Sequence, residues 1–531
     1  MLWNRCFVPT CVIATMFTIP TLPAEDVTVP SRFSKLELGP DTTRIVGPLN
    51  KYGYPDYARA LDAELAEGVG RDENFWALMW PAVGNAERSR EDYLRAVEQR
   101  LNIQISREPR LMTGSQIGVA PFSANPRSEL DTAATPWSRA DAPELAAWLD
   151  ENADNLNEVH AAALRPKAYA PLVYNSEDSV TLAAILLPHV QMQRQVARVL
   201  AARAMLRIND GDMDGAWSDI TDIYRIAAHT ERGFTLIEQL VGYAMRQIAQ
   251  TAMVQWLAHA DLSADELEAR WTELKPLLPV DSLARSIEGE RYLYLDTVCL
   301  MLSGRSDADA AMSLFELDAV VLATDDSLPA GEVDRTRTAR QAMIKLILAG
   351  ADVNETLRYG NVVYDELAAA MDQPTHGERA ALLADIEQRV SENAAITKDT
   401  GELLKAYFLS GREAAQQVPA RVLVGLLTPA ITQCEVAQTR VQANAACLEA
   451  AFAAKSFAIE HGRLPTSLNE IINSGRPQPT DPFTGDALKF RADAESVTIY
   501  SVGRNGVDDA GQPQGNSPQA DDLPTRLNLA R

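Results

Sequence analysis

Residues 188–211 have the sequence PHVQMQRQVARVLAARAMLRINDG, which indicates the fold class of the chain. A proline begins the stretch, and apolar side chains recur at helical spacing until Asn209-Asp210-Gly211. Proline is favoured in the first turn of a helix, and glycine is favoured just past its end. The stretch therefore predicts one long amphipathic helix that ends at Gly211.

The segment after Gly211 predicts a second helix that packs against the first. Gly211-Asp212-Met213-Asp214-Gly215-Ala216 resembles the turn between the paired helices of a tetratricopeptide repeat, in which a small residue lets the helices approach. The resemblance covers one hairpin, whose second helix would be 214–228, and no second copy follows at a period of about 34 residues. We expect stacked helical hairpins, TPR-like in this one place, rather than a repeat array.

Helical periodicity extends over most of the chain on both sides of this hairpin. Further helical patterns cover 142–165, 234–259, 263–275, 281–303, 332–349, 352–371, 377–394 and 400–415. Residues 106–140, rich in Pro, Ser, Thr and Gly, predict a long loop. Strand-like alternation is almost absent before residue 480. The sequence therefore predicts N-terminal helices and a loop over 25–140, followed by an all-helical body of hairpins over 141–430.

The composition excludes several functional classes. The chain has 531 residues, and 49 Lys+Arg against 73 Asp+Glu give a formal net charge of −24. Because such a surface repels phosphate backbones, we expect no general nucleic-acid binding. The 46% hydrophobic content can fill a sizeable core, and the Gly and Pro contents are near average, which excludes collagen-like and wholly disordered chains. A chain of this length is expected to fold as more than one unit.

Residues 1–24 have the layout of a secretory signal peptide. A single charge, Arg5, precedes an apolar stretch from Phe7 to Ala24, and acidic residues follow. The stretch is too short and too interrupted by proline for a good membrane span. We expect an exported, periplasmic or extracellular protein without a stable membrane span after leader removal. A weak membrane anchor is the alternative if the leader is not cleaved.

Export would leave three cysteines, Cys299, Cys434 and Cys447. On one continuous helix the last two would lie about 20 Å apart, which is too far for a disulfide. No Cys-x-x-Cys pair occurs in the chain, which excludes thioredoxin chemistry and zinc ribbons. The sequence therefore predicts buried free thiols.

Gly233-Phe234-Thr235-Leu236-Ile237-Glu238 has the sequence of the processing site of type IV prepilins, in which a peptidase cuts after the glycine. That chemistry needs a site near the N-terminus, followed by an apolar membrane helix. Here the motif is more than 200 residues into the chain, and polar residues, with Arg246 among them, interrupt the helix. We interpret the motif as part of an amphipathic core helix whose inward side chains are Phe234, Leu236, Ile237, Leu240, Tyr243 and Ala244.

Residues 431–531 predict a small α+β domain. A helical pattern with one apolar face begins at Val441 and ends at His461-Gly462-Arg463-Leu464-Pro465, and a short helix follows over 467–472. After a turn, residues 488–491 and 497–502 predict an antiparallel hairpin whose apolar face covers the long helix. The chain then continues as a loop, 503–522, rich in Gly, Asn, Asp and Pro.

This order of elements resembles the globular part of the major pseudopilin of type II secretion systems. The resemblance covers about 90 residues and lacks the filament-forming stem, because the apolar run before residue 431 is too short to span a bilayer. The layout also resembles uncharacterised exported bacterial proteins that join a helical body to such a tail. The matching motifs are His461-Gly462-Arg463-Leu464-Pro465, Asp481-Pro482-Phe483 with Gly485, Tyr500-Ser501-Val502-Gly503 and Ala520-Asp521-Asp522-Leu523.

The pseudopilin resemblance implies a calcium site in the closing loop, where that family holds the ion through carbonyl and carboxylate oxygens. Calcium prefers six to eight such oxygen ligands. Asn505 stands where the family has an aspartate, which removes one charge. The alternative is a solvated acidic loop in an acidic protein. The candidate ligands are the carbonyls of Ser501 and Val502 and the side chains of Asn505, Asp508, Asp509, Asp521 and Asp522.

Other side chains carry weaker functional signals. Glu288, Glu290 and Asp296 crowd one helical segment and could serve hydrolysis as paired carboxylates, although ion pairing is the simpler interpretation. Trp76 and Trp80 could line a binding groove, but a pair at this spacing more commonly anchors a core. The six histidines are scattered, and no zinc, nucleotide-binding or serine-hydrolase motif occurs.

We therefore expect an exported helical scaffold or interaction protein that binds protein or peptide partners in the cell envelope. The resemblance implies a link to a type II secretion-type apparatus and a calcium-binding C-terminal domain. One alternative is an exported hydrolase that uses carboxylates in a cleft of the helical body. Another is true pseudopilin behaviour, with cleavage after Gly233.

Overall fold

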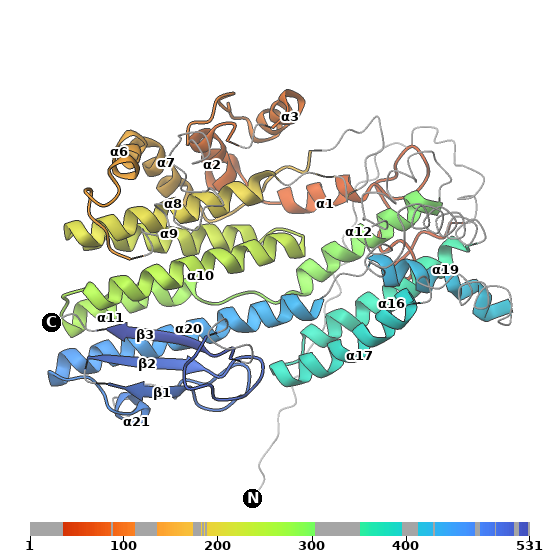
Figure 1. Cartoon of the computed structure of the whole chain (residues 1–531). Helices are drawn as coiled ribbons and strands as arrows, with labels where there is room; N and C mark the ends of the chain where they lie inside the picture. The colour runs from red at the N-terminus through yellow and green to blue at the C-terminus, as the bar shows by residue number, and fades with distance from the viewer. Residues whose placement is uncertain are drawn as a thin grey trace, which may run out of the picture.

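A computed structural model describes residues 36–86, 89–111, 135–173, 182, 185, 188–302, 351–395, 412–427, 431–472, 478–493, 495–513 and 520–528. Over this part of the chain the fold is mainly helical, with 64% helix in 15 helices, and a small antiparallel sheet lies at the C-terminal end (Figure 1). The predicted mainly α fold with a small α+β end is confirmed at this level. The proposed leader 1–24, the helical pattern 332–349, and most of the loop 106–140 and of the pattern 400–415 lie outside the described residues.

Three long helices, here called the central helices, pack against one another in the middle of the molecule (Figure 1). They are α8 (Pro188–Asp210), α9 (Met213–Glu231) and α10 (Leu236–His259). The helix predicted from residues 188–211 is confirmed, and Gly211 ends it in the left-handed region, with φ of 79°. α8 and α9 form the predicted hairpin.

Gly215 has a local role at the start of α9. The Asp212 carboxylate caps α9 by accepting a hydrogen bond from the Gly215 N–H at 3.0 Å. A Cβ atom at Gly215 would lie 2.1 Å from Asp212 Oδ2. The glycine therefore makes room for the capping carboxylate, and the likeness of this turn to a tetratricopeptide repeat stays a prediction.

The N-terminal helices lie on one side of the central helices, where α7 contacts both α2 and α9 (Figure 1). The helical pattern predicted over 142–165 is confirmed as two helices that meet at Asn152, and the helix over 91–101 was not predicted. The elements on this side are α1 (Tyr57–Ala66), the 3₁₀ turn η1 (Arg71–Glu73), α2 (Phe75–Val83), α3 (Glu91–Leu101), α6 (Pro143–Glu151) and α7 (Ala153–Ala163).

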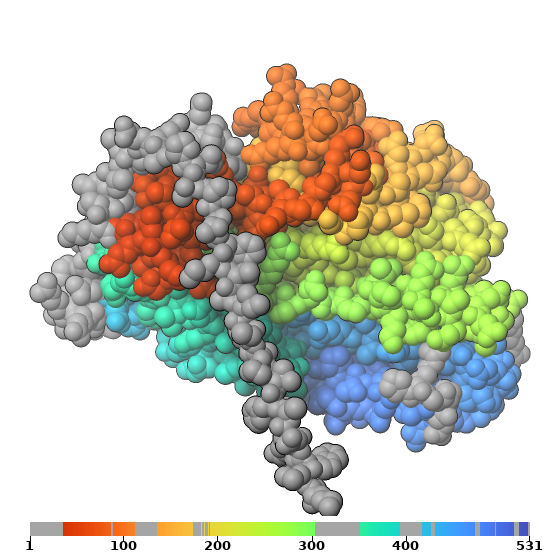
Figure 2. All heavy atoms as spheres, turned by 180° about the vertical axis from the view of Figure 1, so that it is seen from behind, coloured from red at the N-terminus to blue at the C-terminus, as the bar shows by residue number. Residues whose placement is uncertain are grey.

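A second group of helices has its own apolar core, into which Cys299 and Cys434 are buried. Figure 2 shows the N-terminal segment around residues 36–56, in red, lying over α16. From α16, Asn361 Nδ2 donates hydrogen bonds to the carbonyl oxygens of Asp41 and Thr42 in this segment. The helices after α10 are α11 (Ala264–Leu274), the 3₁₀ turn η3 (Lys275–Leu277), α12 (Ala284–Leu302), α16 (Val353–Met371), α17 (His376–Ala395) and α19 (Arg412–Leu427).

The predicted inward face of α10 is partly wrong. Ile237 is 60% exposed and Leu240 is 38% exposed, whereas Arg246 and Gln250 are buried. α10 is packed between α9 and the C-terminal helix, so its polar side lies inside the protein. Those polar groups have partners there, because Gln250 donates to the carbonyl of Asn444 at 2.9 Å and Arg246 forms a buried ion pair.

The C-terminal part consists of α20 (Ile431–His461), α21 (Leu468–Ile472), β1 (Lys489–Ala492), β2 (Ser496–Ser501) and β3 (Leu523–Asn528). The predicted hairpin is confirmed within one residue at each end, with Lys489 opposite Tyr500. The third strand was not predicted; it pairs antiparallel with β2, so that Leu523 lies opposite Ser501. The sheet order is β1-β2-β3, and β3 contacts both α10 and α20.

α20 connects the two halves of the fold. Its beginning lies in the core of the second helix group, where Ile431 and Cys434 are buried, and its later turns carry Cys447 and Phe452 into the core shared with the sheet. The three described cysteines are free and buried, as predicted. The domain boundary at residue 431 stays a prediction.

Candidate functional site

The turn that begins at Asp481 organises the end of β2. Asp481 is buried, and its carboxylate accepts hydrogen bonds from Ser501 Oγ at 2.8 Å, from the Val502 N–H at 2.9 Å and from the Phe483 N–H at 3.0 Å. Ser501 Oγ in turn accepts from the Gly503 N–H. A buried carboxylate with several donors holds a fixed geometry. Asp481 is thus the structural centre of this region, a role the sequence motif alone did not specify.

The predicted calcium-site residues surround the loop that follows. The Asn505 N–H donates to Asp521 Oδ2 at 3.2 Å, and its side-chain amide donates to Asp509 Oδ2 at 3.2 Å. Tyr500 donates its hydroxyl proton to Asp508 Oδ1 at 2.9 Å. Gly503 has φ of 67°, and a Cβ there would lie 2.3 Å from the carbonyl oxygen of Asp521. The loop therefore closes tightly over Asp521.

Asp522 is the buried carboxylate of this loop. Its Oδ2 accepts from the Gly511 N–H at 2.7 Å, while its Oδ1 and the Oδ1 of Asp521 are buried without a hydrogen-bond partner. Burial raises the pKa of Asp522, and the neighbouring carboxylates of Asp509 and Asp508 raise it further. A proton, a cation or a water molecule can partner such oxygens.

The structure brings the candidate ligands together only in part. Ser501, Val502, Asn505, Asp508, Asp509, Asp521 and Asp522 all lie at the end of β2, in the loop or at the start of β3. Over the described residues, no three His, Cys, Asp or Glu side chains gather closely enough to hold a metal ion by themselves. A metal here would need carbonyl oxygens as well.

The acidic residues of α12 point to separate partners instead of forming one paired-carboxylate site. Glu288 lies in ion pairs with Arg44 and Arg291. Asp296 accepts a hydrogen bond from the Leu182 N–H at 2.6 Å. Glu290 accepts one from the Leu236 N–H at 3.0 Å, at the first turn of α10. Burial raises the pKa of Glu290 to about 7, and the charge of Glu238 adds to the rise.

The raised pKa of Glu290 predicts a pH-dependent stability. The carboxyl group binds its proton more tightly in the folded chain than in the unfolded chain, so the folded state loses relative stability as pH rises from about 4.5 through 7. Glutamine cannot ionise, so the free energy of unfolding of Glu290→Gln lacks this loss. Measured against the wild type, it should gain about 2 kcal/mol when the pH is raised from 5 to 8. Urea unfolding at both pH values measures this difference. The same difference at both pH values would contradict the assignment, and Glu288→Gln serves as the control.

The prepilin-like motif forms a helix cap. Glu238 Oε2 accepts hydrogen bonds from the Phe234 and Thr235 N–H groups, and Thr235 Oγ1 accepts from the Glu238 N–H, which makes a capping box. A Cβ at Gly233 would lie 2.1 Å from the Glu238 carboxyl carbon. The glycine and the glutamate thus have a local structural role at the start of α10.

A serine, a histidine and an aspartate meet between α7 and α9. His160 Nδ1 lies 2.6 Å from Asp222 Oδ2 and 3.3 Å from Ser218 Oγ, and the hydrogen bond with Asp222 raises the pKa of His160. A catalytic triad needs the acid and the serine on opposite ring nitrogens. Because both groups meet the same nitrogen here, this arrangement cannot work as a triad.

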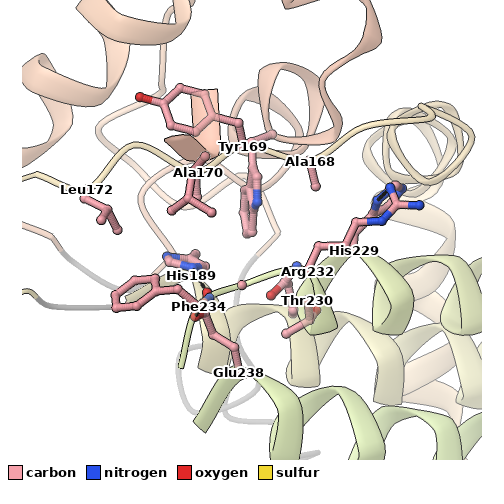
Figure 3. A pocket seen from close by; sticks show the side chains of 14 residues that line it. Ala168, Tyr169, Ala170, Leu172, His189, His229, Thr230, Arg232, Phe234 and Glu238 are labelled. Carbon is pink, nitrogen blue, oxygen red and sulfur yellow. Dashed lines mark hydrogen bonds and ion pairs between the residues drawn. The ribbon is translucent and has the colours of Figure 1, made fainter. Parts of the chain in front are cut away.

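The tryptophans of α2 anchor the core. Trp76 and Trp80 are buried, with ring centroids 5.6 Å apart, and Trp76 meets the His189 ring edge-on. A small cavity of about 30 Å³ lies beside Trp76, with His189, Phe234 and Glu238 on its lower side in Figure 3. That volume suits a water molecule rather than a sugar or a peptide. The interpretation of both rings as core residues is supported.

No membrane-crossing element is present among the helices that the structure describes, since none combines the necessary length and apolar character. Comparison of the chain with known protein families, curated proteins and solved structures finds no match. Inferences about function consequently rest on the residues and contacts described above.

Proposed function

We propose that this protein is an exported scaffold or interaction protein of the cell envelope, with a pseudopilin-like, calcium-binding C-terminal domain linked to a type II secretion-type apparatus. The orphaned carboxylate oxygens of Asp521 and Asp522 carry the calcium part of this proposal. The pseudopilin part is supported by a sheet packed on one long helix and by the contacts of Asp481 with Ser501 and Val502.

Calcium would add positive charge to a loop in which carboxylates outnumber cations. Asp508, Asp509, Asp521 and Asp522 lie in or beside the loop, and the described loop residues include one cation, Arg504. A bound calcium ion would satisfy the free oxygens of Asp521 and Asp522 and would stabilise the charged form of Asp522, whose pKa is raised by burial first and by the charges of Asp509 and Asp508 second. The remaining ligands would be carbonyls near the end of β2, together with Asn505, Asp508 or Asp509.

We expect calcium to stabilise the full-length chain. For a site with Kd of about 10 µM, 1 mM calcium adds about 2.7 kcal/mol to the free energy of unfolding, because the ion binds only the folded loop. Thermal unfolding with calcium and with chelator, together with titration calorimetry, measures the effect. Asp522→Asn should abolish it, whereas Asp486→Asn, on the exposed turn of the same domain, should preserve it. No response up to millimolar calcium would reject the site.

The scaffold proposal is tested in the native cell. Stacked helices present extended surfaces of the kind that bind other proteins. Cross-linking followed by affinity purification should recover envelope proteins, secretion-apparatus components among them, with the tagged chain. Recovery of the chain alone from the envelope fraction, or its presence only in the cytoplasm, would contradict the proposal.

One observation favours a second candidate, an exported hydrolase. A carboxyl group with a pKa of about 7, such as Glu290, is suited to general acid–base catalysis near neutral pH. The support is weaker than for a scaffold, because Glu290 accepts the Leu236 N–H and so completes the cap of α10. A hydrolytic activity that Glu290→Gln abolishes without lowering stability would favour this candidate.

A further inference from the structure

A hollow of about 490 Å³ opens on the surface beside α1 and α3. α1 contributes Arg59 and Asp62 to its wall, η1 contributes Arg71, α3 contributes Arg100, and Tyr169 lies on the segment after α7. Its volume falls within the range of sites that bind small molecules. It is separate from the C-terminal loop and from the small cavity beside Trp76, although Tyr169 also borders that cavity.

The hollow carries an excess of positive charge. Three arginines line it, and Asp62 is its single lining carboxylate. Asp62 already has its full set of partners, since it accepts hydrogen bonds from Arg100 Nη1 at 2.8 Å, from the Tyr169 hydroxyl at 3.0 Å and from the Leu172 N–H at 2.7 Å. The charge of Arg100 offsets that of Asp62.

Arg59 and Arg71 are the two other arginines in the wall of the hollow. Within the residues that the structure describes, neither guanidinium lies within ion-pair distance of a carboxylate, although the chain has a net charge of −24. Burial raises the pKa of Asp56, and Arg59 is close enough to that carboxyl group to offset part of the rise. Guanidinium groups bind carboxylates and phosphates through paired hydrogen bonds. Two such groups facing one hollow form a receptor for an anion.

Most of the remaining wall is apolar, although Asn74 and Tyr169 also line it. Ala63, Ala66 and Val69 from the α1 side and Leu101 at the end of α3 line the hollow next to the arginines. We propose that this hollow binds a small organic anion, whose carboxylate or phosphate group lies on Arg59 and Arg71 and whose apolar body lies on Leu101 and α1. A bare inorganic anion would leave the apolar wall uncovered.

The proposal is tested on the full-length chain with four probes: phenyl phosphate, benzoate, benzyl alcohol and inorganic phosphate. We expect one or both of the organic anions to bind in titration calorimetry and to raise the melting temperature, and to bind at least ten-fold more tightly than benzyl alcohol or inorganic phosphate. The preferred organic anion then tells whether the head group is a phosphate or a carboxylate. Raising the salt concentration should weaken binding.

Variants locate the site. Arg59→Gln with Arg71→Gln should reduce the affinity for the organic anion at least ten-fold, while Arg95→Gln, which changes an exposed arginine on the same helix as Arg100 but outside the hollow, should leave it unchanged. The replaced side chains are exposed, so the wild type and both variants should unfold at the same urea concentration. Equal midpoints would show that a loss of binding does not come from misfolding. Three results would overturn the proposal: unchanged affinity in the double variant, equal binding of all four probes, or no binding of either organic anion at about 10 mM. That concentration is about ten times a weak, millimolar Kd.

Discussion

Replacing Arg246 with methionine is expected to lower the free energy of unfolding by about 3–5 kcal/mol, the cost of leaving a buried charge unpaired. Arg246 and Glu231 are both buried, and the guanidinium donates to the two carboxylate oxygens at 2.6 and 2.7 Å. The same guanidinium also donates to the carbonyls of Leu277 and Pro279. Its hydrogen bonds therefore link α9, α10 and the chain around the end of η3. Methionine would leave the carboxylate and these carbonyls without donors.

Urea unfolding of the variant measures this loss. Arg139→Met is the control, because Arg139 pairs with Asp150 on the surface, where an ion pair contributes at most about 1 kcal/mol. The variant Arg246→Met with Glu231→Leu should regain part of the stability, since it removes the orphaned charge but not the unpaired carbonyls. A loss no larger than that of the control would show that solvent reaches this pair.

The second large effect is expected at Gly289, where alanine should cost about 3 kcal/mol, the upper end of the typical range for overpacking. Gly289 lies in the middle of α12, and a Cβ atom there would be 1.8 Å from the carbonyl oxygen of Phe234 and 2.9 Å from its carbonyl carbon. The obstacle is backbone, so no side-chain rotation can relieve it. α12 would have to move away from the start of α10, which would also break the hydrogen bond between Glu290 and Leu236.

Gly377→Ala is the matched control, because a Cβ atom there meets nothing within 4 Å at the start of α17. Alanine at such a helical position is neutral or adds about 0.4–1 kcal/mol. The two substitutions are chemically identical, so opposite signs in a thermal or urea unfolding experiment would isolate the effect of packing. If both substitutions changed the free energy of unfolding by the same small amount, Gly289 would not lie so close to the carbonyl of Phe234.

The sequence predicted those elements whose signals are local. Pro188 and Gly211 mark the ends of α8, and alternating polarity marks the hairpin of β1 and β2. β3 was missed because its existence depends on pairing with β2. Its sequence hides it, because Pro524 is unusual in a strand and the polar Thr525 occupies one of its buried positions.

Burial on α10 was mispredicted for a related reason. Apolar periodicity assumes that one face of a helix meets solvent, but α10 is enclosed by α9 on one side and α20 on another, and the polar side chains facing them are paired. Of the candidate sites, the C-terminal loop could be predicted from the sequence, because its aspartates lie close to one another along the chain. The hollow with Arg59 and Arg71 could not, because no motif joins α1, η1 and α3.

The 31 residues of α20 form one uninterrupted rod about 46 Å long. Helices of this length curve gently, but no break divides α20 into independent parts. α20 contacts β2 and β3 with one part and α17 with another, so the length of this one helix sets the spacing between the sheet and the second helix group.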